Sequence, residues 1–193
     1  MTRRVLDAAA RAGVPAPGRR SIEAALDAAM RPRILRLDDD HDPLYLHPGR
    51  TALILLEDVG ITDPAVLSAG ALAETLRPDL AAEPPAESSL APGTLDILHE
   101  VPLPQRDRDT LAERLVTASA PARLVAVAER LDHARHLHLL DRSLWTPLHR
   151  ETREVYLPVA DRTDPTLTRR LLRWCTAFAE RFLAAYEHRA PDA

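Results

Sequence analysis

The sequence predicts an all-α fold, and three observations support this prediction. Apolar residues recur every three or four positions along most of the chain, which is the spacing of one face of a helix. Proline, glycine, serine and aspartate stand at the ends of these segments, where helices begin and end. No stretch alternates apolar and polar residues as a half-buried strand does. We expect a single domain over residues 1–193, a bundle of about seven or eight helices.

Four helices are predicted in the N-terminal half, each with a start or stop signal. The segments are residues 2–12, 21–30, 48–59 and 63–76. Gly13 and Gly60 end the first and third helices, as glycine commonly does. Ser21 is the expected N-cap of the second, and Asp63 with Pro64 begins the fourth.

The C-terminal half is predicted to form four more helices. The segments are residues 107–118, 121–140, 150–160 and 165–186. Residues 31–42 are dense in charge of both signs and predict a polar loop. Residues 77–93 are rich in Pro, Ala, Glu and Ser, which predicts a mobile loop within one domain. Trp174, Phe178 and Phe182 lie four apart and are expected to close the core.

Composition and charge exclude several classes of protein. The net charge of −4 and the pI near 6.1 leave no basic field for nucleic acid. There is no apolar run of membrane-spanning length and no signal-peptide pattern, so we expect a cytoplasmic protein without a membrane partner. Lys and Asn, which have AT-rich codons, are absent, and this indicates a high-GC bacterial genome. The single Cys175 lies in a helix pattern and predicts a buried, structural thiol.

The helix over residues 121–140 is expected to organise the fold. Its apolar stripe consists of Leu124, Val127, Ala128, Leu131 and Ala134. Glu129, Asp132, His133 and His136 share another face, because residues three, four and seven apart are neighbours on a helix. The ordinary interpretation is a solvated face with acid–imidazole pairs one turn apart.

Four segments together carry a family resemblance. They are YLHPGRTALIL at residues 45–55, GITDPAVLSAGALAET at 60–75, LVAVAERLDHAR at 124–135 and ETREVYLPVADR at 151–162. In the same order, they resemble the YxxHPxxVAxIL segment, the helix ending in AALLHDxxEDT, the LVKLADRLxNxR motif and the ETxxIYxPLAxR motif of the HD-domain hydrolases of the RelA/SpoT family. The resemblance is strongest over residues 45–160 and is closest to the small stand-alone alarmone hydrolases. It implies an HD-domain-like helical bundle.

The resemblance also implies positions for a metal site. The family holds a divalent ion, usually manganese, through a His, an adjacent His-Asp pair and a later Asp. The first ligand is kept as His47, the His-Asp pair falls on Ala73 and Glu74, and the last Asp falls on Glu129. The family's substrate-contacting Asn falls on His133. His47, Glu74 and Glu129 are therefore expected to converge from three helices and to form the metal set if a metal is retained.

The chain departs from the family at its catalytic residues. The family's Glu-Asp pair falls on Arg77 and Pro78, and neither side chain can act as a general base or position a water. We therefore expect a degenerate HD-type protein without hydrolase activity and without a cofactor, acting as a nucleotide-binding or interaction module. The alternative is a manganese-dependent guanosine polyphosphate 3′-pyrophosphohydrolase, or a related nucleotide phosphohydrolase, with an altered metal set.

Each candidate metal ligand has a second interpretation. His47 is also placed to hydrogen-bond a backbone group at a helix start. For Glu74 and Glu129 we favour an ion pair with an arginine over a metal, because a buried lone carboxylate is costly. The candidate partners are Arg77, Arg130 and Arg135. A relocated metal site of Glu129, His133 and His136, with His47 facing them, is the further alternative.

Candidate nucleotide contacts come from the resemblance as well. Its phosphate-binding loop corresponds here to arginines, whose planar donor fork suits phosphate, and the plain alternative is surface charge. The candidates are Arg31, Arg33, Arg36, Arg50, His133 and Tyr156. The implied ligand is a guanine nucleotide.

Overall fold

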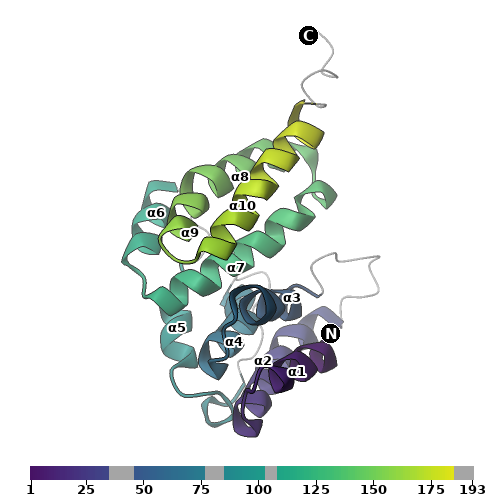
Figure 1. Cartoon of the computed structure of the whole chain (residues 1–193), viewed down its shortest axis with the longest axis vertical. Helices are drawn as coiled ribbons and strands as arrows, with labels where there is room; N and C mark the ends of the chain where they lie inside the picture. Colours follow the sequence, from purple (N-terminus) through teal and green to yellow (C-terminus); the bar gives the residue numbers. More distant parts are fainter. Residues whose placement is uncertain (35–45, 77–84, 103–107, 185–193) are drawn as a thin grey trace.

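The computed structural model describes residues 1–34, 46–76, 85–102 and 108–184, and every regular element within these ranges is a helix (Figure 1). The all-α prediction is therefore confirmed. Among the described helices, none has both the length and the apolar character needed to span a bilayer.

The N-terminal helices begin and end largely where the sequence predicts. They are α1 (Thr2–Arg11), α2 (Ala16–Ile34), α3 (His47–Leu53), η1 (Ile54–Val59), α4 (Pro64–Leu72) and η2 (Ala73–Leu76). Gly13 and Gly60 follow α1 and η1 with φ of 84° and 86°, a conformation that glycine adopts without strain. The Asp63 carboxylate accepts from the amide of Ala65 at 2.8 Å and so caps α4.

The predicted start of α2 is wrong. The helix begins at Ala16, and Ser21 lies inside it, where its hydroxyl donates to the Pro17 carbonyl one turn back. A serine that bonds the preceding turn is compatible with a helix interior, and this is why Ser21 mimics a cap in the sequence. α2 also includes residues 31–34 of the predicted polar loop, and residues 35–42 lie outside the described part.

The predicted loop over residues 77–93 is described only from residue 85, where η4 (Glu87–Ser89) forms a short 3₁₀ turn. α5 (Thr94–Glu100) follows it and was not predicted. Its seven residues are too few for a helical periodicity to be recognised in the sequence.

The remaining elements surround or follow α7. They are α6 (Arg108–Thr117), α7 (Ala120–His136), η5 (Leu137–Leu139), η6 (Arg142–Leu144), α8 (Trp145–Glu151), η7 (Thr152–Tyr156), α9 (Leu157–Asp161), α10 (Pro165–Phe178) and η8 (Ala179–Leu183). Ser119 caps α7 by accepting from the amide of Ala122. Asp164 caps α10 in the same way, accepting from Thr166 and Leu167.

α7 is the centre of the fold, as predicted. In Figure 1 it lies between α1–α4 and the group α8–α10, and it packs against α3, α4, η1, η2, α9 and α10. Its apolar residues Val125, Val127 and Leu131 join the main core. Asp132, on its polar face, is fully buried as well. Because both faces of α7 are covered, its acidic and imidazole side chains lie inside the protein.

The aromatic side chains of α10 and η8 form a second core. Phe178 stacks on Trp174 and on Phe182 with ring centroids 4.9 Å apart in both pairs, and Trp145 meets it edge-on. This cluster also contains Leu137 and is separate from the main core. The prediction that these rings close the main core is therefore wrong. The rings pack instead on residues that follow α7, which are Leu137, Leu140, Trp145 and Leu148.

Candidate functional site

Three side chains converge beside α7. His47 is the first residue of α3, Glu74 lies in η2 and Glu129 lies on α7. The His47 Nε2 atom is 3.8 Å from a Glu74 oxygen and 3.9 Å from a Glu129 oxygen. The predicted convergence is confirmed, and metal binding by these residues stays a prediction.

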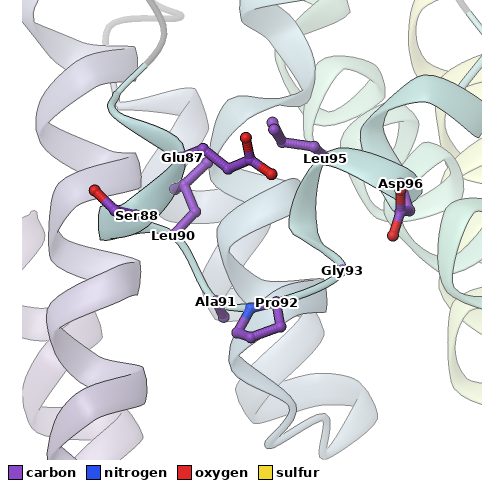
Figure 2. A pocket seen from close by; sticks show the side chains of 8 residues that line it. All are labelled: Glu87, Ser88, Leu90, Ala91, Pro92, Gly93, Leu95 and Asp96. Carbon is purple, nitrogen blue, oxygen red and sulfur yellow. The ribbon is translucent and has the colours of Figure 1, made fainter.

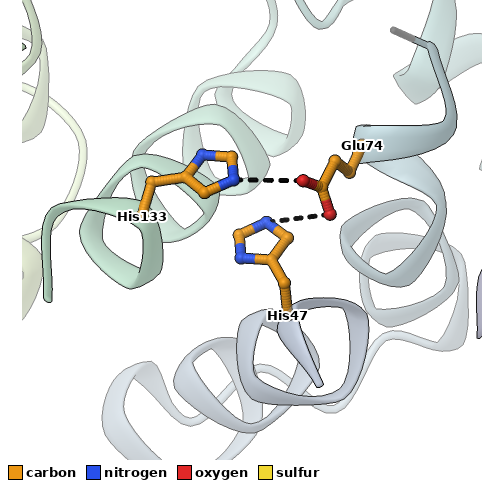
Figure 3. A group of neighbouring side chains, drawn as sticks. All are labelled: His47, Glu74 and His133. Atoms are coloured by element: carbon orange, nitrogen blue, oxygen red, sulfur yellow. Dashed lines mark hydrogen bonds and ion pairs between the residues drawn. The ribbon is translucent and has the colours of Figure 1, made fainter. Parts of the chain in front are cut away.

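His133 fills the space between the two glutamates. Its Nε2 lies 3.1 Å from Glu74 Oε1, and its Nδ1 lies 3.0 Å from Glu129 Oε1. Its ring is stacked on His47 with centroids 4.1 Å apart and an interplanar angle of 3° (Figure 3). An imidazole with a carboxylate on each nitrogen donates through both, which is the protonated form. His133 is therefore the cation of this cluster.

The electrostatics of the cluster follow from this contact. Although burial opposes protonation, Glu129 and Glu74 raise the pKa of His133 to about 9. Burial likewise opposes ionisation of Glu129, but the charge and hydrogen bond of His133 lower the pKa of that carboxyl to about 2. At neutral pH the cluster thus holds an imidazolium beside the ionised Glu129, with an oxygen of Glu74 at its other nitrogen.

Asp132 contacts both His47 and Arg50 next to the cluster. One of its oxygens lies 2.7 Å from His47 Nδ1, and Arg50 Nε lies 2.8 and 2.9 Å from the two oxygens. These hydrogen bonds outweigh burial and lower the pKa of Asp132 to about 2. Burial and the neighbouring charge of His133 lower the pKa of His47, which keeps this ring neutral. The neutral ring donates from Nδ1 to Asp132 and turns Nε2 toward Glu74 and Glu129.

The interpretation of this helix face as solvated is wrong, because even His136, the most exposed of its four residues, is only 23% exposed. Asp132 is fully buried, and the side chains of Glu129 and His133 are only 16% and 18% exposed. Acid–imidazole pairs one turn apart on a helix have the same spacing whether the face is in water or against α3 and η2. The sequence identifies the residues that share this face of α7, and the packing of α7 against α3 and η2 determines that they are shielded from solvent.

The predicted arginine partners of Glu129 pair elsewhere. Arg130 forms an ion pair with Glu151 at 3.1 Å, and Arg135 lies 3.9 Å from Asp58. Arg77 falls outside the described residues. His133 supplies the positive charge because it lies one turn from Glu129 on α7, whereas Arg130 points toward α8 and η7.

His136 does not join the cluster. Its Nδ1 atom lies 2.8 Å from the carbonyl oxygen of Asp132, one turn back on α7. Within the described part of the chain, the group of potential metal ligands is His47, Glu74 and His133. Of the relocated metal site, His133 lies in this group and His136 does not, and metal binding there stays a prediction.

The candidate nucleotide contacts are only partly accessible. Tyr156 is buried, with the Arg130 guanidinium 5.0 Å above its ring, so it presents no face to a ligand. Burial raises the pKa of its hydroxyl. Arg31 is exposed on α2, and within the described residues it makes no ion pair with the cluster. Arg50 is held by Asp132. The side chain of Arg33 and the whole of Arg36 lie outside the described part.

The degenerate motif positions are described only in part. Ala73 is buried beside Glu74, so the position of the family's second imidazole is a methyl group in the core. Arg77 and Pro78 lie outside the described residues.

A surface hollow of about 760 Å³ lies near α5, away from these residues (Figure 2). Its lining includes Glu87, Ser88, Leu90, Leu95 and Asp96. It shares no residue with the cluster at His133.

Whether a metal ion fits between these residues depends on the orientation of the two imidazoles. One ligand atom each from His47, Glu74 and His133 lies within 4.8 Å of the others, and two imidazoles with a carboxylate suit a transition metal. The rings, however, are parallel to within 3°. In-plane lone pairs of two stacked rings do not point at one ion, so a metal fits only after one ring has rotated. In the observed arrangement the residues do not fit a metal.

No known family model matches the chain, and a search of curated proteins returns no match.

Proposed function

We propose that this chain is a non-hydrolytic binding module, built on an HD-like helical scaffold, in which an imidazolium takes the place of a metal ion. The observation that carries the proposal is the position of His133. Both of its nitrogens contact carboxylates that correspond to metal ligands in the RelA/SpoT hydrolases, at 3.1 and 3.0 Å. The positive charge that such carboxylates require is thus supplied by the chain itself.

The chemistry of the neighbouring residues supports the same proposal. Hydrolysis of a phosphate ester requires an activated water and a base or metal to activate it. The space between Glu74 and Glu129 is taken by the His133 ring, and an Arg and a Pro stand where the family has its acidic pair. The proposed ligand is a guanine nucleotide, which the module binds without cleaving it. Burial of Tyr156 makes it a poor contact for such a ligand.

One observation favours a second candidate, a metal-dependent phosphohydrolase with an altered ligand set. His47 keeps its Nδ1 on Asp132, and this second contact is typical of a histidine that orients its other nitrogen toward a metal. In this case His133 is a ligand instead of a cation, and the substrate is a guanosine polyphosphate or a related nucleotide.

Manganese binding separates the two candidates because they predict opposite signs for one variant. If His133 is the internal cation, His133→Asn removes the positive charge that lies against Glu129 and Glu74, and the variant binds Mn²⁺ more tightly than the wild type. If His133 is a ligand, the same variant binds Mn²⁺ more weakly. His136→Asn is the matched control, since this histidine lies on the same helix outside the cluster.

The measurement is isothermal titration calorimetry of Mn²⁺ into protein stripped with a chelator, followed by incubation with guanosine tetraphosphate and manganese. We expect the wild type to bind Mn²⁺ weakly and to release no pyrophosphate. Steady, chelator-sensitive release of pyrophosphate by the wild type refutes the non-hydrolytic proposal and supports the second candidate.

A further inference from the structure

One side of α10 is exposed along most of its length and carries both apolar and charged residues. The helix lies at the surface of the molecule and leads toward the C-terminal end of the chain (Figure 1). Leu172 is 53% exposed, and Arg169, Arg173 and Thr176 are exposed as well. Glu180 follows, exposed, in η8, which continues α10. Each of these five residues lies three or four positions from another, so they share one side of the helix, which we call the α10 face.

The charged residues of the α10 face have little contact with their own chain. Within the described ranges, the side chains of Arg173 and Glu180 form no ion pair and no hydrogen bond. They do not reach each other either, because seven residues along a helix span about 10 Å. Arg169 approaches the Thr166 hydroxyl at 3.5 Å. The face therefore presents positive charge at its N-terminal end and negative charge at its C-terminal end.

A hollow lies at the N-terminal end of the α10 face. Its volume is about 420 Å³, and its lining includes Thr168 and Leu172 of α10 together with residues 161–165. At the other end of the face, the partly exposed Ala179 and Leu183 add apolar surface. The α10 face thus has a hollow with positive charge at one end and apolar side chains with negative charge at the other.

We propose that the α10 face binds the same face of a second copy of this chain, with the two α10 helices antiparallel. A two-fold axis places the same surface on both partners, so such a surface has to be complementary to itself. When the axis passes between Thr176 and Ala177, Arg173 of each copy faces Glu180 of the other, because both residues are equally far from the axis. The second copy thus supplies the opposite charge that each of these side chains lacks.

The same register also matches the apolar surface. Leu172 then lies between Ala179 and Leu183 of the second copy, as a side chain of one helix lies in the groove of another. Leu183 of the second copy comes next to Thr168 and Leu172, at the hollow. A parallel pair would instead place like charges opposite each other, which is unfavourable. Charge and shape therefore favour the same antiparallel register.

The experiment is sedimentation equilibrium of the full chain with a chelator present, between about 5 and 500 µM, a range that suits a small interface. We expect the average mass to rise from one copy to two as the concentration increases. Leu172→Glu places a charge in the apolar contact and is expected to raise the dissociation constant by about tenfold or more. Val116→Glu is the control, because Val116 is 49% exposed on α6, outside the α10 face. It is expected to change the dissociation constant by less than about twofold.

Two charge variants test the register itself. Arg173→Glu places a glutamate against Glu180 of the other copy, and Glu180→Arg places an arginine against Arg173. Each variant alone is expected to dimerise about tenfold more weakly, because the symmetry repeats the like-charge contact twice. An equimolar mixture of the two variants has opposite charges at both contacts and is expected to dimerise as tightly as the wild type. This recovery arises only between two chains, because neither variant carries both changes.

Three results overturn the proposal. They are a wild type that stays a single copy at every concentration, no greater weakening by Leu172→Glu than by Val116→Glu, and a mixture of the charge variants that dimerises no better than its components. The wild-type and charge-variant measurements decide the question even if Leu172→Glu does not fold. The dimer does not depend on the proposed function, because the measurement involves neither a metal nor a nucleotide.

Discussion

Removing the imidazolium at the centre of the cluster is expected to change how stability depends on pH. The pKa of His133 is raised from 6.5 to about 9, and its side chain is only 18% exposed. A group whose pKa is raised in the folded state stabilises the fold below its unfolded pKa, and this contribution is lost as the pH rises through the folded pKa. The relevant window is therefore pH 6.5 to 9.

The size of the effect follows from the two pKa values. Protonated His133 contributes about 3 kcal/mol to the free energy of unfolding at pH 6.5 and about 1 kcal/mol at pH 8.5. Glu129 and Asp132, with pKa values of about 2, stay ionised throughout this range and add no slope. Burial raises the pKa of the Cys175 thiol, so the folded state disfavours its ionisation and this residue adds a loss of stability only at the alkaline end.

The assay is urea unfolding followed by circular dichroism at pH 6.5, 7.5 and 8.5, in the presence of a chelator. The wild type is expected to lose about 2 kcal/mol between the first and last pH values. His133→Gln does not titrate, so it should lose much less over the same range and be less stable than the wild type at pH 6.5. A wild-type unfolding free energy that is flat with pH, or the same slope in both proteins, would refute the assignment of His133 as the internal cation.

Two further predictions concern Asp132, which contacts His47 and Arg50 beside the cluster, and Phe178 in the second, aromatic core. Asp132→Asn should lower the free energy of unfolding by about 2 kcal/mol at pH 7, because the pKa of Asp132 is lowered from 3.8 to about 2. A carboxyl whose pKa is lowered on folding loses its stabilising contribution as it becomes protonated. The difference in unfolding free energy between Asp132→Asn and the wild type should therefore shrink as the pH falls from about 4 to about 2 in the same urea assay. Phe178→Ala should cost about 3–5 kcal/mol in thermal unfolding, since Phe178 is buried among Trp145, Trp174 and Phe182. The slope between pH 6.5 and 8.5 should survive in this variant, and its loss would contradict the separation of the two cores.

The helix ends were predictable because their chemistry is local. Asp63 and Ser119 cap their helices with their own side chains, and Gly60 adopts a φ that other residues avoid. The same local logic failed at Ser21, whose hydroxyl bonds a carbonyl inside α2. A serine offers one hydrogen bond in either place, so the sequence alone does not separate a cap from a helix interior.

The sequence predicted which residues come together at the candidate site, but it did not predict which of them contact one another. The order of motif-like segments brought His47, Glu74 and Glu129 together correctly. The role of Asp132 was missed, although it lies on the face that the periodicity had marked. Its partner His47 is 85 residues away, and no spacing along α7 indicates a contact across that separation.

The differences between this sequence and the RelA/SpoT motifs that it resembles form one chemically consistent pattern. Where those motifs have a second imidazole this chain has Ala73, and where they have an Asn it has His133 on α7, so the number of imidazoles is the same while the position differs. The Glu129 oxygen lies 3.0 Å from a His133 nitrogen. An aspartate at position 129 is shorter by one C–C bond of about 1.5 Å, which takes that contact beyond hydrogen-bond range. The longer carboxylate, unfavourable for a fixed metal geometry, is thus what an ion pair with His133 requires. Replacing Glu129 with Asp alone would break a buried ion pair without creating a metal site, because His133 would still occupy the space between the carboxylates.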